Sequence, residues 1–175
     1  RARRGSGSPA GAGRRGRRVL VVDHARSPGE KIRISGGGRC NFTNKSIAPE
    51  RFLSSNPRFA LSALSRFTPA DFIARVDQAG IAWHEKVLGQ LFCDGSATQI
   101  VRMLTESMRD AGVELKLATV VRKVRLGHEF ELDTDLGALR SDRLVVACGG
   151  KSIPKMGATG FGYQIAQEFG MPVVE

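Results

Sequence analysis

Residues 18–23 read Arg-Val-Leu-Val-Val-Asp, and this segment gives the first indication of the fold class. A continuous aliphatic run of this kind is typical of a strand buried on both faces of a parallel sheet. The predicted strand covers Val19–Val22 and ends at Asp23, after which Ser27-Pro28-Gly29 breaks the extended chain. In dinucleotide-binding sheets an acid at this point accepts hydrogen bonds from ribose hydroxyls. Asp23 equally suits the start of an ordinary turn, and both interpretations stay open.

A second aliphatic run, Leu144–Ala147, closes on Cys148-Gly149-Gly150 and predicts another buried strand. Between the two runs, Ser96 caps an amphipathic helix that ends at Gly112. The pattern also predicts short helices over residues 49–79, strands over 81–84, 90–92, 113–117, 120–126 and 129–132, and a last helix over 163–169. We therefore expect an α/β fold, with a parallel sheet and an antiparallel meander, in one domain over residues 18–175.

Residues 1–17 contain no aliphatic side chain larger than alanine, which predicts a disordered basic segment. The chain has 27 basic and 17 acidic residues, and seven of the basic ones lie in residues 1–18, so the remainder carries a net charge of only +3. An arginine-rich arm can bind phosphate backbones without specificity. Residues 1–41 contain no aromatic side chain that could stack on bases, so the sequence argues against a nucleic-acid partner.

Other classes are excluded by what the sequence lacks. Its longest aliphatic runs are far shorter than the roughly 20 residues that span a bilayer, so no membrane segment is predicted. The three cysteines are widely spaced and form no CxxC pair, which indicates neither a zinc site nor a disulfide framework. With no hydrophobic signal peptide, a reducing, cytoplasmic setting is the default expectation.

Three glycine-rich stretches are candidate ligand sites. Gly11–Gly16 matches G-x-G-x-x-G, but a Pro/Ser/Gly/Arg segment precedes it where the fingerprint needs a strand, so we regard this match as accidental. The three glycines of Ser35–Asn41 permit close backbone approach to a flat or anionic ligand, although a flexible surface loop has the same composition. Gly149-Gly150, followed by the glycines of residues 157–163, suits either a ligand edge or an ordinary strand–turn–helix connection.

Taken together, these residues resemble the BaiN/RdsA-like (YhiN-like) family of FAD/NAD(P)-dependent oxidoreductases. The segment Lys31-Ile-Arg-Ile-Ser-Gly-Gly-Gly-Arg-Cys-Asn-Phe-Thr-Asn44 is similar to the hallmark of that family nearly residue for residue. Ala147–Lys155 running into Gly157–Tyr163, and Arg17–Asp23, resemble two further family segments. The resemblance covers residues 16–175, with departures at Cys148, Ile153 and Phe161, where Thr, Tyr and Asp are usual in the family.

The resemblance implies an FAD-dependent oxidoreductase with NAD(P)H as the electron donor and a small-molecule substrate. It places Asp23 at the ribose of the FAD adenosine, the 36–44 loop beside the flavin and its phosphates, and the backbone of residues 120–121 at the adenine edge. The cofactor-binding residues implied in this way are Asp23, Lys31, Ser35, Gly36, Gly37, Gly38, Arg39, Cys40, Asn41, Thr43, Asn44, Val120, Val121, Ala147, Gly149 and Gly150. Within the family, reduction of activated double bonds and oxidation of amines are both represented.

The resemblance also implies that the chain is incomplete. The family begins with a strand, a glycine fingerprint and a helix, none of which precedes Arg17, and it continues into further domains. We therefore expect a partial FAD-binding, Rossmann-like domain over residues 18–175 that binds FAD weakly alone, whether the missing elements reflect truncation or a shifted reading frame. A non-functional truncated flavoprotein and a nucleic-acid-binding protein with a basic arm remain the alternatives. No catalytic acid or base stands out, and substrate, choice of NADH or NADPH, and oligomeric state stay open.

Overall fold

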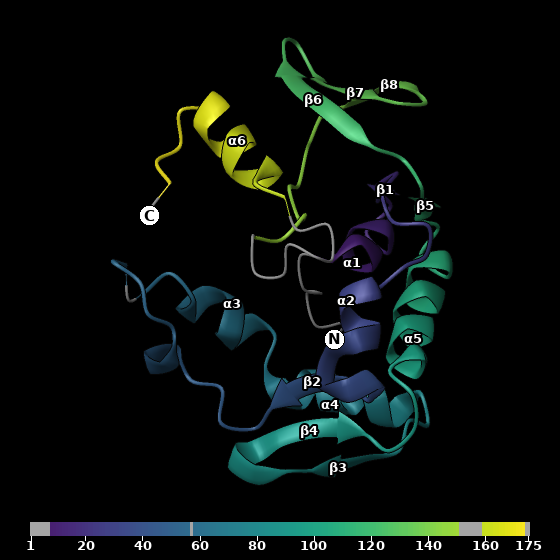
Figure 1. The fold of residues 1–175 in the computed structure, drawn as a ribbon, viewed down its shortest axis with the longest axis vertical. Coiled ribbons are helices and arrows are strands. Elements are labelled where there is room, and N and C mark those ends of the chain that lie inside the picture. The colour runs from purple at the N-terminus through teal and green to yellow at the C-terminus, as the bar shows by residue number, and fades with distance from the viewer. Residues whose placement is uncertain (1–7, 57, 151–158, 174–175) are drawn as a thin grey trace. The chain divides into compact units, whose positions relative to one another are not determined.

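A computed structural model describes residues 8–56, 58–150 and 159–173, and the chain divides into two compact units, Arg1–Ala118 and Thr119–Glu175. The sequence predicted a single domain over residues 18–175. The division arises because the second unit builds a small core of its own, as described below. Each unit is considered by itself (Figure 1).

The first unit contains a two-stranded parallel sheet. Strand β1 (Leu20–Val22) pairs with β5 (Glu114–Lys116), with Leu20 opposite Glu114. Helix α5 (Thr98–Arg109) leads into β5 and lies beside the short helix α2 (Glu30–Ile34) (Figure 1). The strand predicted at Val19–Val22 is therefore present, but it is not buried on both faces, because Leu20 is 38% exposed.

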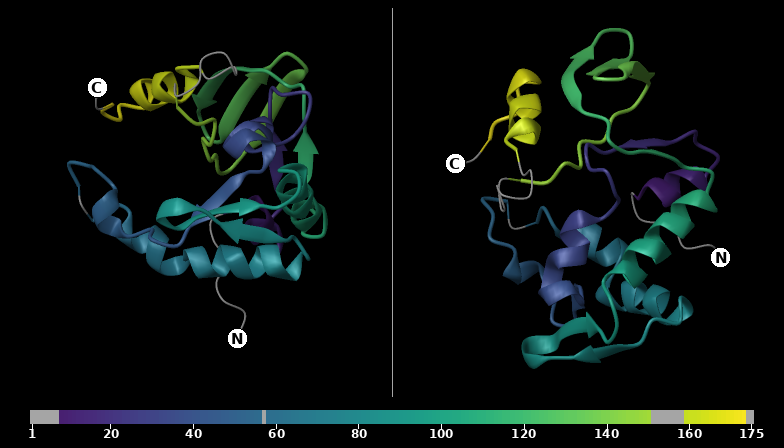
Figure 2. Two further views of the ribbon diagram at one scale, coloured as in Figure 1. Left: turned by 60° about the horizontal axis from the view of Figure 1, so that its bottom comes forward. Right: turned by 45° about the vertical axis from the view of Figure 1, so that its right-hand side comes forward.

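The same unit holds a three-stranded antiparallel sheet in the order β2-β4-β3. Its strands are β2 (Asn41–Asn44), β4 (Gln90–Cys93) and β3 (Trp83–Glu85), and the 3₁₀ turn η3 (Val87–Gly89) joins β3 to β4. Helix α4 (Pro69–Gln78) lies along one face of this sheet (Figure 2). A capping box between Thr68 and Asp71 starts α4, which presents its buried Val76 to the core.

The core under α4 combines buried side chains from several elements. It consists of Cys40, Val76, Ile81, Cys93, Ala97 and Ile100, with Phe42, Phe72 and Trp83 packed against it. Two further short helices, η2 (Pro49–Arg51) and α3 (Leu61–Arg66), occupy the predicted helical region before α4. The helices predicted over residues 49–79 and from Ser96 onward are thus present with small shifts of their ends.

The second unit is an antiparallel meander with one helix. Strands β6 (Val121–Leu126), β7 (Phe130–Thr134) and β8 (Gly137–Ser141) pair in that order, and α6 (Phe161–Glu168) follows. Val124, Leu132 and Ile165 form the buried core of this unit. The predicted α/β class, with a parallel sheet and an antiparallel meander, is confirmed, although β8 had not been predicted.

The structure corrects the expectation that residues 1–17 are disordered, for the part of that segment it describes. Pro9–Gly13 forms helix α1, capped by the Ser8 hydroxyl, which accepts a hydrogen bond from the Gly11 N–H at 3.2 Å. Ala10 is only 6% exposed. A Cβ on Gly13 would lie 2.3 Å from the Ala111 carbonyl oxygen, so this small-residue segment packs by close backbone approach, which a count of large aliphatic side chains overlooks.

The strand predicted at Leu144–Ala147 is also wrong. These residues have no regular secondary structure, and Val145 is 80% exposed. A strand requires hydrogen bonds from a neighbouring strand, and within residues 8–56, 58–150 and 159–173 no strand pairs with this segment. In the described part of the chain, no helix is long and apolar enough to cross a membrane.

Candidate functional site

The centre of the candidate site is the glycine loop of residues 35–40. Gly36, Gly37 and Gly38 have φ angles of 59°, 66° and 86°, and Cys40 has φ 52°. This left-handed backbone disfavours residues with a Cβ by about 1–2 kcal/mol each, so a run of three such positions explains the three consecutive glycines. The 3₁₀ turn η1 (Ser35–Gly38) therefore contains a short left-handed stretch.

Hydrogen bonds on both sides hold the loop in place. The Gly38 carbonyl accepts from the Ala97 N–H at 2.7 Å, and the Arg39 carbonyl accepts from the Cys93 N–H at 2.9 Å. The Cys40 N–H closes the loop by donating to the Ser35 carbonyl at 2.9 Å. These bonds attach the loop to the end of β4 and the start of α5, so it is an ordered element and not the flexible surface loop that its composition also allowed.

The two sides of the loop differ. A Cβ on Gly36 would lie 2.5 Å from the Phe92 ring, so Gly36 lets the loop pack directly on that side chain. A Cβ on Gly37 would meet no atom within 4 Å, and Gly37 is exposed. The loop therefore has one packed side and one side that is open to a ligand.

The polar residues of β2 have different surroundings. The Asn44 amide donates to the Leu88 carbonyl at 2.8 Å and accepts from the Ser46 N–H at 2.7 Å, which ties β2 to the η3 turn. Asn41 is exposed and lies opposite Phe92 in the sheet. Thus Asn44 has a structural role in the turn, whereas Asn41 stands on the surface next to the glycine loop.

Asp23 follows β1 and makes a local turn. Its carboxylate Oδ1 accepts from the Ala25 N–H at 3.0 Å, and its own N–H donates to the Lys116 carbonyl at 2.9 Å, which extends the parallel ladder. The turn interpretation of Asp23 is therefore what the structure shows directly. Its side chain remains 40% exposed.

The residues predicted from the second half of the chain lie in the second unit. Ala147, Gly149 and Gly150 line an open hollow of about 560 Å³, together with residues of α6. A Cβ on Gly150 would lie 2.9 Å from the Tyr163 hydroxyl, so the glycine lets the end of that side chain approach the backbone closely. The Val120 N–H donates to Asp135 Oδ1 at 2.8 Å, and its carbonyl accepts from the Asp135 N–H at 3.1 Å.

The predicted site residues thus form two groups. Asp23 and residues 31–44 belong to the first unit, and residues 120–121 and 147–150 belong to the second. The expected parallel sheet containing both Val19–Val22 and Leu144–Ala147 is not formed, since β1 pairs only with β5 among the described residues. The segment 151–158, which includes Ile153, lies outside the described residues.

A pair of titratable side chains that the sequence did not single out lies next to the glycine loop. His84 Nδ1 is 2.5 Å from Asp94 Oδ1, and the His84 ring stacks on Phe92 with centroids 6.2 Å apart and an interplanar angle of 19°. The Lys86 Nζ lies 4.3 Å from the centroid of the same Phe92 ring. The sequence contained one signal for this pair of side chains. The strands predicted at 81–84 and 90–92 imply a hairpin, and such a hairpin brings residues 84 and 94 close together.

Burial controls the chemistry of the two cysteines at the loop. Burial raises the pKa of the Cys40 thiol, and a hydrogen bond with the Ser35 side chain opposes this only in part. The pKa of Cys93 is raised to about 11, first by burial and then by its neighbours Cys40 and Asp94. Both groups are therefore neutral thiols near pH 7, and a neutral thiol is a poor nucleophile.

The loop of residues 35–40 suits a flat ligand, because Gly37 leaves its backbone exposed and hydrogen bonds on both sides hold the loop in place. In the second unit, considered by itself, glycines also line the hollow at residues 149–150. In the part of the chain that the structure describes, no group of histidine, cysteine and acidic residues is suited to a metal ion. A left-handed glycine loop beside a sheet in an α/β unit is the kind of site found in dinucleotide-binding proteins.

These features define a Rossmann-type domain of the flavoprotein oxidoreductases. More specifically, the chain belongs to the family described as HI0933-like protein Rossmann domain, whose model matches residues 7–175. The BaiN/RdsA-like resemblance is thereby confirmed, and FAD is the cofactor of this class.

Among curated proteins, the chain is 51% identical over 164 residues to the ribosomal RNA dihydrouridine synthase of Escherichia coli (strain K12), a match that covers 93% of this chain and 41% of that protein. It is 25% identical over 154 residues to the 3-dehydro-bile acid delta(4,6)-reductase of Clostridium scindens, covering 87% of this chain and 37% of that protein. The chain thus spans about two-fifths of the length of these relatives.

Among solved structures, the fold is similar to that of the Diels-Alderase PyrE3, with a TM-score of 0.50 and 17% sequence identity. The match covers 84% of this chain and 32% of PyrE3. At this level of identity the similarity concerns the fold alone.

Proposed function

We propose that this chain carries part of the FAD site of an enzyme that reduces a carbon–carbon double bond conjugated to a carbonyl group, and that its substrate is a uracil base in ribosomal RNA. The observation that carries the proposal is the rigid glycine loop of residues 35–40, in a chain 51% identical to a ribosomal RNA dihydrouridine synthase. By their names, that relative and the bile acid delta(4,6)-reductase both act on carbon–carbon double bonds, which supports a shared reaction class.

In this proposal the chain's residues bind and position the cofactor. Asp23 meets the adenosine ribose with its second carboxylate oxygen, since Oδ1 is bonded to Ala25. The loop of residues 36–44, together with Lys31 and Ser35, lies beside the flavin and its phosphates. Residues 120–121 meet the adenine, and residues 147–150 approach the cofactor closely. FAD supplies the hydride chemistry when bound, with NAD(P)H as the donor that reduces it.

Two details constrain the adenine contact. Both backbone groups of Val120 are already bonded to Asp135, so the carbonyl would accept a second hydrogen bond and the N–H would have to leave Asp135. Val121 is paired with Thr134 in the meander. The backbone at residues 120–121 is therefore the part of the proposed site that must rearrange most on binding.

A ribosomal RNA substrate departs from the sequence-based expectation that nucleic acid is not a partner. That expectation rested on the basic segment and on the absence of aromatic residues near it, and it concerned RNA as a bound polymer. The expectation of no nucleic-acid partner stays a prediction, and our proposal of a uracil base in RNA as the substrate differs from it. The same substrate leads us to propose a cytoplasmic location, where ribosomes are found.

The experiment is a two-stage anaerobic assay on the whole enzyme that contains this chain, loaded with FAD. Loss of flavin absorbance on addition of NADH or NADPH reports the first half-reaction. Return of that absorbance on addition of either a ribosomal RNA transcript or a simple cyclic enone reports the second, and mass spectrometry of the RNA then detects the gain of two hydrogens by uridine. Reoxidation by the enone alone would contradict the RNA substrate, and reoxidation by neither would contradict the reaction class.

A further inference from the structure

We propose that His84, oriented by Asp94, is the proton donor for the double-bond reduction. The inference rests on the proposed function and adds the acid that the sequence analysis did not find. It starts from a row of residues across the antiparallel sheet, in which Asn41 lies opposite Phe92 and Phe92 lies opposite His84. Directly opposed residues in a sheet point to the same face, so these three side chains share one surface.

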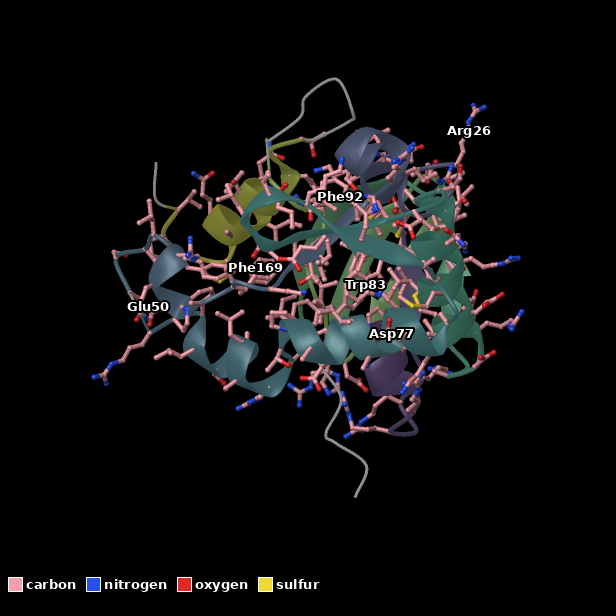
Figure 3. The ribbon with its side chains drawn as sticks, turned by 90° about the horizontal axis from the view of Figure 1, so that it is seen from below. Arg26, Glu50, Asp77, Trp83, Phe92 and Phe169 are labelled. Atoms are coloured by element: carbon pink, nitrogen blue, oxygen red, sulfur yellow. The ribbon has the colours of Figure 1, made fainter. Side chains whose placement is uncertain are left out.

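That surface is the one that carries the glycine loop. Trp83, the neighbour of His84 in β3, packs into the core on the side of α4, where its indole N–H donates to Asp77 Oδ1 at 2.8 Å. Figure 3 shows Trp83 toward α4 and Phe92 on the other side of the strands. Since Gly36 packs against the Phe92 ring and His84 stacks on that ring, His84 and the loop contact the same side chain.

The geometry of His84 suits proton transfer. Asp94 Oδ1 at 2.5 Å occupies Nδ1, and the Asp94 backbone is itself fixed because its N–H donates to the Ala82 carbonyl at 2.9 Å. Within the described residues, Nε2 has no hydrogen-bond partner, and the side chain is 35% exposed. A carboxylate that holds one ring nitrogen directs the transferable proton to the other, which is the arrangement used in general acid–base catalysis.

The step balances as one hydride and one proton. When bound, reduced FAD would supply the hydride that forms a C–H bond at the β-carbon of the conjugated double bond, and it would be left oxidised. The π electrons move toward the carbonyl, and the α-carbon takes the proton from Nε2 of the His84 imidazolium. The ring is left neutral with its remaining proton on Nδ1 beside Asp94, and solvent then returns a proton to Nε2.

The chain offers a direct test of the ring geometry without any cofactor. It contains only three histidines, His24, His84 and His128, so the imidazole nitrogens of a ¹⁵N-histidine-labelled sample can be assigned with single variants. We expect the neutral His84 ring to carry its proton on Nδ1 in the wild type and to lose this preference in Asp94→Asn. A neutral ring protonated on Nε2 in the wild type would overturn the proposal.

The role itself is tested by single turnovers of the whole enzyme that contains this chain, loaded with FAD. His84→Gln should slow flavin reoxidation by the unsaturated substrate about 10²–10⁴-fold, while flavin reduction by NAD(P)H and reoxidation by ferricyanide, which needs no proton on carbon, change less than about twofold. Asp94→Asn should give a smaller loss in the same step, because Asp94 is a positioning residue. The matched control is His128→Gln, which replaces an exposed histidine in the β6–β7 turn of the other unit.

The outcomes separate the two proposals. If the wild type reduces the substrate and His84→Gln does so at the same rate, the acid assignment is wrong and the reaction class stands. Equal losses in the NAD(P)H, ferricyanide and substrate steps would mean that His84 has only a structural role, which also overturns the assignment. If His84→Gln does not fold, Asp94→Asn and the nitrogen spectra decide the question.

Discussion

At the scale of single residues, the glycines of the loop are not equivalent, although the sequence shows them as three identical letters. Gly36 and Gly37 share a left-handed backbone, but only Gly36 has a neighbour where a side chain would be. The resemblance identified the loop, and no local pattern distinguishes its packed side from its open side. That difference depends on Phe92, which is more than 50 residues away in the chain.

Alanine substitutions at these two positions separate backbone strain from packing. Gly37→Ala should lower the free energy of unfolding by about 1–2 kcal/mol, the cost of a Cβ in a left-handed conformation. Gly36→Ala should cost about 1–3 kcal/mol more, because its Cβ would also overlap the Phe92 ring. Urea titration of both variants measures the two values, and equal losses would mean that the packing against Phe92 is not as described.

The cysteines give a second prediction at this scale. Cys40 and Cys93 are buried with raised pKa values, whereas Cys148 is exposed. We expect one thiol per chain to react quickly with a thiol reagent at pH 8 in the native state, and three after denaturation. Because the folded-state pKa of Cys93 lies above its unfolded value of 9.0, stability should fall as the pH rises from about 9 toward about 11. Two fast thiols at pH 8 would contradict this.

At the scale of elements, prediction succeeded where the signal was local. The helix expected after Ser96 is α5, and its amphipathic period and terminal Gly112 lie within one stretch of sequence. The strand expected at Leu144–Ala147 failed because hydrophobicity alone does not make a strand when no partner supplies the hydrogen bonds. Helix α1 was missed for the opposite reason, since its packing on α5 depends on small residues that carry almost no hydrophobic signal.

The order of α1 can be checked by amide hydrogen exchange. Residues 11–16 should exchange more slowly than in a free peptide, since the N–H groups of residues 12, 14 and 15 donate to backbone carbonyls within the helix and at its ends. Gly13→Ala should remove this protection, because the added Cβ would lie 2.3 Å from the Ala111 carbonyl oxygen. Gly127→Ala, where a Cβ would meet nothing within 4 Å, serves as the control. Peptide-like exchange in the wild type would restore the sequence-based expectation of disorder.

At the scale of the whole molecule, the division between Ala118 and Thr119 was not predictable from patterns of hydrophobicity. Strands β5 and β6, which lie on either side of this division, are only a few residues apart in the sequence. They differ in their partners, since β5 pairs in parallel with β1 and β6 pairs with its neighbour β7. The proposed cofactor residues are distributed over both units, so the fold class was predictable but the separation of these residues into two groups was not.

This distribution leads to a prediction about the isolated chain. A dinucleotide pyrophosphate is bound by a strand, a tight glycine turn and a helix N-terminus in succession. Gly11–Gly16 instead lies in and after helix α1, and strand β1 follows it. We therefore expect the 175-residue chain to bind FAD more weakly than about 1 μM. Titration followed by flavin fluorescence measures this, and tighter binding would mean that another segment anchors the phosphates.

The left-handed turn at residues 36–38 has a consequence for molecular handedness. A backbone with positive φ is unfavourable for L-amino acids but is the natural conformation of their mirror images, and glycine occupies it only because it is achiral. A chain assembled by chemical ligation with D-alanine in place of Gly37, which is exposed, should therefore be more stable by about 0.4–1 kcal/mol, because the substituted chain loses less freedom on folding. At this position ribosomal synthesis offers no better residue than glycine, and the fold retains a place where a D-residue would fit better than any L-residue.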